Sequence, residues 1–128
     1  MRYAAALLLC ACVPDPCPFD LSGTWVNASD PSFAYRLRDA RGAVEGELAA
    51  DASVTLRLLR PSLSGSMRAP AASKSGKPCP FDFSLRVTIC RAGELQIRAE
   101  AAAQLDDDCR RVAPARPDLV EFLWIRRQ

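Results

Sequence analysis

The fold is decided by residues 81–89, which read Phe-Asp-Phe-Ser-Leu-Arg-Val-Thr-Ile. Successive side chains of a β-strand point to opposite faces, so nine alternating residues predict a strand with one buried, apolar face. The alternation stops at Arg91-Ala92-Gly93 and resumes over residues 94–101. Two such runs joined by a short segment that contains glycine predict a β-hairpin.

The same period of two recurs on both sides of this hairpin. We predict eight strands, near residues 22–28, 33–39, 43–50, 53–60, 62–69, 80–90, 94–103 and 118–127. Most of the connections between them are short, which favours antiparallel neighbours. The fold class is therefore all-β, and we expect an eight-stranded antiparallel up-and-down barrel, because closure removes the exposed sheet edges.

The N-terminal residues have the features of a leader. Arg2 supplies a positive charge, and residues 3–9 form an apolar stretch that is too short to cross a bilayer, which takes about 20 residues. Residues 9–12, Leu-Cys-Ala-Cys, resemble the bacterial lipobox. That resemblance implies cleavage after Ala11 and attachment of a diacylglycerol to Cys12. A plain apolar strand with incidental cysteines is the alternative.

The lipobox resemblance also predicts the domain organisation and the address. It implies a signal peptide over residues 1–11, a tether over 12–20 and a barrel domain over 21–128. The protein would be lipid-anchored in the bacterial cell envelope. By resemblance to sorting in Gram-negative bacteria, Val13 after the lipidated cysteine implies the outer membrane, with the domain facing the periplasm or the cell surface.

The chain has six cysteines, at positions 10, 12, 17, 79, 90 and 109. If Cys10 leaves with the leader and Cys12 carries lipid, four remain, and an even number in an oxidising compartment predicts two disulfides. In an up-and-down barrel, the start of the first strand and the end of the sixth lie at the same end, so we predict a Cys17–Cys90 bridge. By the same reasoning, Cys79 and Cys109 meet at the opposite end.

The composition argues against several classes of function. There is no histidine, so the commonest general base and metal ligand is missing. No C-x-x-C pair suggests zinc, and the consecutive acids at residues 106–108 lack the alternating ligands of calcium loops. The net charge is +2 with dispersed basic residues, which does not suggest a nucleic-acid surface. We expect no catalytic residues, no metal and no cofactor.

Residues 21–27, Leu-Ser-Gly-Thr-Trp-Val-Asn, together with residues 42–46, resemble the opening of avidin-type barrels. The Gly-x-Trp pattern is also similar to that of lipocalins, in which a basic residue near the last strand packs over the tryptophan. This resemblance implies a calycin-like barrel in which Arg126 or Arg127 takes that part.

Biotin binding is not implied by the same resemblance. Asn27 matches a ligand-contacting asparagine of the avidin pattern, but Glu47-Leu48 stands where a tyrosine is expected. The only tryptophan besides Trp25 is Trp124, so the later pocket tryptophans of the avidin pattern have no counterpart.

Aromatic residues on the inward faces provide the candidate binding site. We predict Trp25, Asn27, Tyr35 and Trp124 as ligand-binding residues if the barrel is hollow; an interior filled by side chains is the alternative. The expected function is a membrane-anchored, non-catalytic binding or interaction module, with an unknown protein or a small apolar ligand as its partner. The alternative is a periplasmic inhibitor of a protease or lysozyme, with residues 13–20 as the candidate inhibitory segment.

Overall fold

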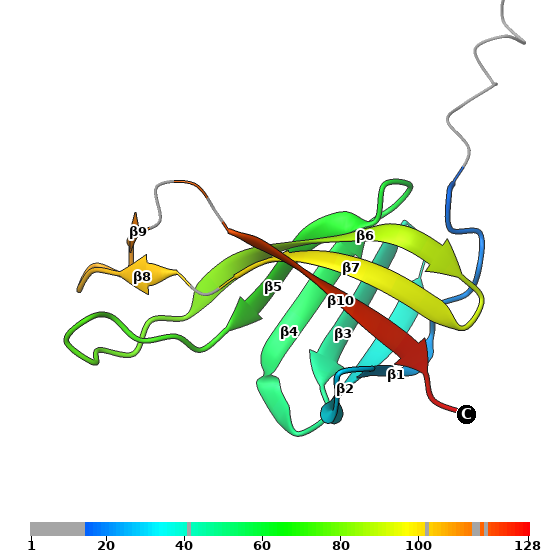
Figure 1. Ribbon diagram of the computed structural model, residues 1–128, viewed down its shortest axis with the longest axis horizontal. Helices are drawn as coiled ribbons and strands as arrows, with labels where there is room; N and C mark the ends of the chain where they lie inside the picture. Colours follow the sequence, from blue (N-terminus) through cyan, green and yellow to red (C-terminus); the bar gives the residue numbers. More distant parts are fainter. Residues whose placement is uncertain (1–14, 41, 102, 114–115, 117) are drawn as a thin grey trace, which may run out of the picture.

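The computed structural model is an all-β structure built round one closed barrel (Figure 1). It describes residues 15–40, 42–101, 103–113, 116 and 118–128. The barrel strands are β1 (Gly23–Asn27), β2 (Asp30–Ala40), β3 (Ala43–Leu48), β4 (Asp51–Leu59), β5 (Ser64–Ala69), β6 (Phe81–Arg91), β7 (Glu94–Glu100) and β10 (Leu119–Arg126). A separate two-stranded sheet contains β8 (Gln104–Leu105) and β9 (Arg111–Ala113).

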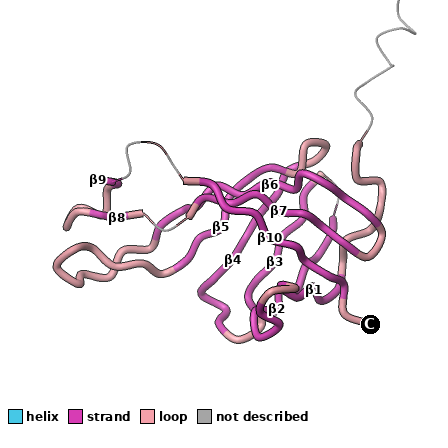
Figure 2. The backbone as a smooth tube through the Cα atoms, viewed as in Figure 1, coloured by secondary structure: helices cyan, strands magenta, loops and turns pink. Residues whose placement is uncertain are grey.

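The strand order confirms the predicted topology. Each strand from β1 to β7 pairs with the next, and β10 pairs with both β7 and β1, all antiparallel. The eight barrel strands therefore run up and down and close on themselves. Figure 2 shows the strands in magenta, joined by pink turns. This arrangement is consistent with a calycin-like barrel.

The inward face of the strands forms the hydrophobic core. Fully or almost fully buried side chains include Trp25, Leu37, Val44, Leu58, Leu95 and Ile97. They belong to the alternating apolar sets that the sequence shows, so burial of one strand face drives closure of the sheet.

A β-bulge in β6 changes which face its last residues occupy. The pairing with β7 runs Val87↔Ile97 and then Ile89↔Gln96, so Thr88 is an extra residue. The alternating pattern predicts Ile89 on the inner face, and this is wrong: its side chain is 45% exposed. The extra residue reverses the alternation, and Cys90 packs against the core instead.

Both predicted disulfides are present. Cys17 is joined to Cys90, and Cys79 to Cys109, over sequence separations of 73 and 30 residues. In the loop-entropy description, bridges of these spans stabilise the fold by about 4.5 and about 3.5 kcal/mol.

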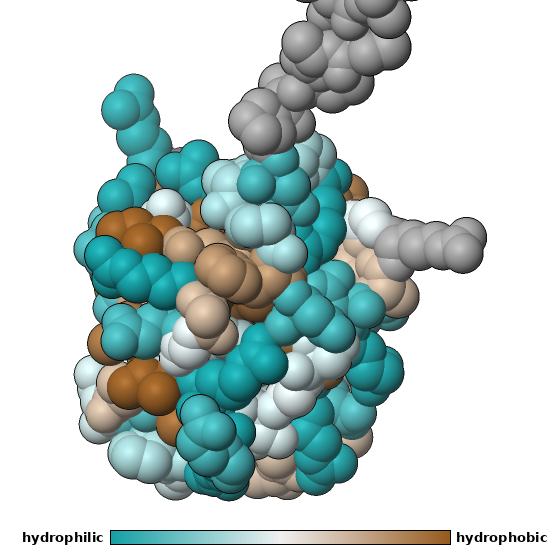
Figure 3. All heavy atoms as spheres, turned by 90° about the vertical axis from the view of Figure 1, so that its right-hand side faces the viewer, coloured by the Kyte–Doolittle hydropathy of each residue, from teal (hydrophilic) through white to brown (hydrophobic). Residues whose placement is uncertain are grey.

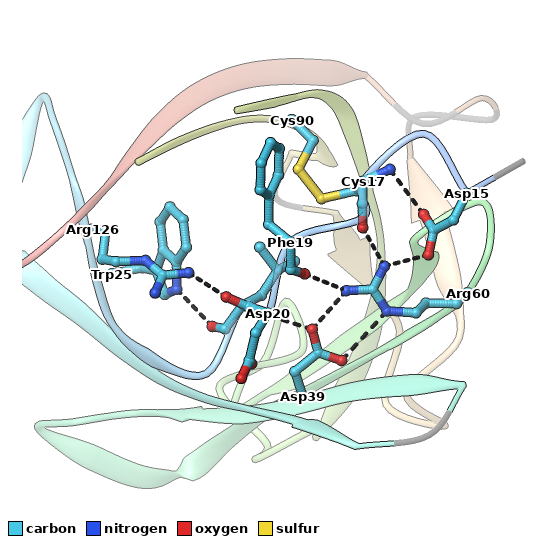
Figure 4. Close-up of a disulfide and its surroundings, with 10 residues drawn as sticks. Asp15, Cys17, Phe19, Asp20, Trp25, Asp39, Arg60, Cys90 and Arg126 are labelled. Carbon is cyan, nitrogen blue, oxygen red and sulfur yellow. Dashed lines mark hydrogen bonds and ion pairs between the residues drawn. A yellow bond between two sulfur atoms is a disulfide. The ribbon is translucent and has the colours of Figure 1, made fainter. Parts of the chain in front are cut away.

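One end of the barrel is closed by the chain that precedes β1. Figure 4 shows the Arg60 guanidinium between Asp15 and Asp39, where it also donates to the carbonyl oxygens of Cys17 and Phe19. Its hydrogen bonds to Asp39 raise the pKa of Arg60 above its ordinary value. Residues 1–14, which include Cys12, lie outside the described residues. Residues 15–20, the last part of the expected tether, are held against this end by Arg60.

The last strand completes the closed end. The Arg126 guanidinium lies over the Trp25 ring, 4.8 Å from its centroid, and donates to the carbonyl oxygen of Asp20. The Trp25 indole N–H donates to the carbonyl oxygen of Leu21 at 2.8 Å. Of the two basic residues expected over the tryptophan, Arg126 is therefore the one that packs there (Figure 4).

An arm that the sequence pattern does not predict lies beyond the end of the barrel opposite Arg60. It consists of β8, β9 and the connection between β5 and β6. The expected seventh strand, residues 94–103, ends at Glu100, and β8 and β9 lie where mainly loop was expected. The Cys79–Cys109 disulfide joins this sheet to the loop between β5 and β6, and the Lys74 N–H donates to the carbonyl oxygen of Leu105. The two connections project together from the barrel in Figure 1.

The surface at the closed end is mixed. Figure 3 faces this end and shows both apolar and polar side chains, with brown and tan atoms gathered near its upper centre. Exposed apolar residues of the chain include Phe19, Ile89 and Ile125.

Close approach of strands β4 and β5 depends on Gly65. A Cβ atom at this position would lie 1.9 Å from the Arg57 carbonyl oxygen, which is backbone and cannot move away cheaply. We predict that Gly65→Ala lowers the free energy of unfolding by about 3 kcal/mol or more, measured by urea denaturation. Gly93→Ala is the matched control, because nothing lies within 4 Å of its Cβ position. Equal losses in the two variants would contradict the prediction.

Candidate ligand cavity

The end of the barrel opposite Arg60 holds a cavity of about 400 Å³. Its described lining is mostly apolar and includes five aromatic side chains. The lining residues are Asn27, Phe33, Tyr35, Met67, Ala69, Pro70, Phe83, Ser84, Leu85, Ala99, Glu100, Phe122 and Trp124. The interior is thus filled at one end and hollow at the other, which combines the two alternatives left open by the sequence.

A stacked pair of aromatic rings forms one wall of the cavity. The Tyr35 and Trp124 ring centroids are 4.5 Å apart, with 19° between the ring planes. The two residues come from β2 and β10, the neighbours of β1 on either side, and register places Trp124 opposite Asn27. Burial raises the pKa of the Tyr35 phenol above its ordinary value, so the ring is uncharged at neutral pH.

Three of the four predicted binding residues line this cavity, and Trp25 does not. Asn27, Tyr35 and Trp124 lie in its wall, whereas Trp25 is completely buried in the core beside Arg126. Trp25 and Asn27 share the inner face of β1, but Trp25 is two residues nearer the closed end, where side chains fill the barrel. Trp25 therefore belongs to the filled part of the interior.

Glu100 is a buried carboxylate in the cavity wall. The ladder between β6 and β7 has its last pair at Leu85↔Ala99, and beyond it the Ser84 N–H donates to Glu100 Oε1 at 3.2 Å. The side chain thus takes the place of a strand carbonyl where the two strands diverge. Its other oxygen, Oε2, forms an ion pair with Arg111 of β9.

The arm brings Arg111 to this carboxylate. The Arg111 guanidinium lies over the Phe81 ring, 5.4 Å from its centroid, while pairing with Glu100. Sequence reasoning missed this pair, because Glu100 has the same place in the alternating pattern as the exposed Glu94. No local signal shows that a residue eleven positions later returns to pair with it.

The acidic run at residues 106–108 has a structural role within the arm. The Asp107 carboxylate accepts hydrogen bonds from the hydroxyls of Ser73 and Ser75, and these bonds lower the pKa of Asp107 below its ordinary value. Lys77 donates from its ammonium to the Asp107 carbonyl oxygen at 2.8 Å. Among the described residues, no group of three or more Cys, Asp or Glu side chains is placed to hold a metal ion.

Comparisons with protein-family models, with curated proteins and with solved structures found no match to this chain. In the part of the chain that the structure describes, no helix has the length and apolar character needed to cross a membrane.

The Glu100–Arg111 pair should show strong coupling in a double-mutant cycle. Arg111→Met leaves a buried carboxylate without its counter-ion, and we predict a loss of about 3 kcal/mol in the free energy of unfolding. The double variant Arg111→Met/Glu100→Gln removes both charges and should lose less than this single variant. Urea denaturation gives the free energy of unfolding of the wild type, of Arg111→Met, of Glu100→Gln and of the double variant. If the losses of the two single variants add up to that of the double variant, the proposed coupling is contradicted.

Proposed function

We propose that this protein is a lipid-anchored binding protein of the bacterial cell envelope, and that the open end of its barrel holds a small, largely apolar molecule. The observation that carries the proposal is the cavity of about 400 Å³ beside the Tyr35–Trp124 stack. Its volume lies within the range of roughly 300–1,000 Å³ that is common for small-molecule sites.

The lining has the character of a binding site. Aromatic rings provide a large contact area and lose little rotamer freedom when a ligand packs on them. Polar groups are few: Asn27, Ser84 and Glu100 lie among apolar neighbours and can orient a ligand. Glu100 is already paired with Arg111, and the chain contains no histidine, so binding is better supported than bond cleavage.

The direction of the barrel also suits an N-terminal anchor. Cys17 is attached by its disulfide to the end that Arg60 closes, and the cavity lies at the other end. A lipid on Cys12 would therefore place the closed end toward the membrane and leave the mouth turned away from it. The two disulfides are in keeping with an oxidising compartment.

The inhibitor alternative gains no support from the N-terminal segment. The carbonyl oxygens of Cys17 and Phe19 accept hydrogen bonds from Arg60, and the Cys17 side chain is buried. A segment that uses its backbone groups in this way is occupied in closing the barrel.

Binding is tested with N-phenyl-1-naphthylamine, a neutral apolar dye whose fluorescence rises in apolar sites. We expect saturable binding to the wild-type protein, weakened about 10-fold by Phe122→Ala, which removes one wall of the cavity. Leu123→Ala is the matched control. Leu123 is the next residue along β10, and its side chain is partly exposed and does not line the cavity. Circular dichroism checks that both variants fold. Absence of saturable binding, or equal loss in both variants, would refute the assigned cavity.

The anchor is tested separately by the intact mass of protein extracted from membranes of an expressing Gram-negative bacterium. The expected mass is that of residues 12–128 plus the acyl groups, and Cys12→Ser should abolish both cleavage and acylation. A soluble product that retains residues 1–11 would contradict the lipoprotein assignment.

A further inference from the structure

We propose that the ligand of this cavity is an organic cation: an ammonium group attached to an apolar body. The inference rests on the proposed binding function and specifies the class of molecule bound. It comes from the charge and the rings of the lining, taken together with the origin of Arg111 outside the barrel.

The first observation is the sign of the charge in the wall. Among the described residues that line the cavity, Glu100 is the only charged one, and its side chain is only 5% exposed. The Ser84 N–H and hydroxyl, at 3.2 and 3.4 Å from Oε1, hold the carboxylate in place. A carboxylate removed from bulk water interacts strongly with a cation that enters the same space and repels an anion.

The second observation is the aromatic character of the remaining wall. Tyr35, Phe83, Phe122 and Trp124 come from three different strands and line the same space as Glu100. The faces of such rings carry partial negative charge and attract ammonium groups. The protein already uses this attraction twice, where Arg126 lies over Trp25 and Arg111 over Phe81.

The third observation is that the counter-ion of Glu100 belongs to the arm. Arg111 lies on β9, outside the barrel strands, and is not among the residues that line the cavity. Its side chain is 21% exposed, against 5% for Glu100. The guanidinium thus reaches the carboxylate from the arm, while Glu100 itself belongs to the lining of the cavity. Arg111 balances the charge of Glu100, and a ligand ammonium would share or replace that contact.

The test uses three naphthalene probes of nearly equal size: 1-naphthylmethylammonium, 1-naphthylmethanol and 1-naphthoate. Each is titrated against the N-phenyl-1-naphthylamine complex, and displacement gives its affinity. For the wild-type protein we expect the ammonium to bind about 10-fold more tightly than the alcohol, and the carboxylate to bind most weakly.

Two variants identify the groups responsible. Glu100→Gln should remove the preference for the ammonium and leave the affinity for the alcohol within about 2-fold. Arg111→Met should strengthen ammonium binding, because it removes the competing cation but keeps a flexible, unbranched side chain. Alcohol binding in each variant shows that the cavity is still formed. Leu123→Ala, on the outer face of the barrel, should leave all three affinities unchanged.

Each result separates the two proposals. Preference for naphthoate that is lost in Arg111→Met would overturn the cation assignment in favour of an anion site. Equal affinities for the three probes, or an ammonium preference that survives Glu100→Gln, would also overturn it while leaving the binding function intact. Failure of every probe, the neutral dye included, would count against the cavity as a binding site.

Discussion

The structure depends on the short seam between β1 and β10, which closes the sheet into a barrel. The seam pairs Trp25 with Arg126, Val26 with Ile125 and Asn27 with Trp124. Two of these pairs have side chains on the inner face of the sheet. The first places Arg126 over the Trp25 ring, and the last places Trp124 beside Asn27 at the cavity. Without this pairing, the strands would leave two free edges and the apolar faces of both ends would meet water.

Closure leaves the interior with two differently packed ends. At one end, Trp25, Leu21 and the Cys17–Cys90 disulfide fill the space, and Arg60 ties the preceding chain across the opening. At the other end, β6 and β7 no longer pair beyond Leu85 and Ala99, and the side chains of the wall leave a cavity of about 400 Å³. Closely packed side chains beneath a preformed cavity limit the conformational freedom that a ligand would have to remove on binding.

The barrel and its two disulfides were predictable from the sequence, whereas the charged part of the candidate site was not. The disulfide pairs followed from strand direction alone, because antiparallel order places the ends of particular strands together. Asn27, Tyr35 and Trp124 were recognisable as inward-facing. Glu100 and Ile89 were assigned to the wrong environment, since a strand end and a bulge both break the strict period of two on which such assignments depend.

The sequence by itself determined the all-β class, the number and order of the barrel strands and the faces that carry their apolar residues, because each follows from local alternation and short connections. Only the tertiary structure decided that one end is filled and the other hollow, and that Arg111 pairs with Glu100. Those properties depend on how residues far apart in the chain share volume and charge. The side chains along a single strand do not show whether they meet those of the opposite strands across the barrel axis. Nor does the long connection that contains Arg111 show where that arginine will lie.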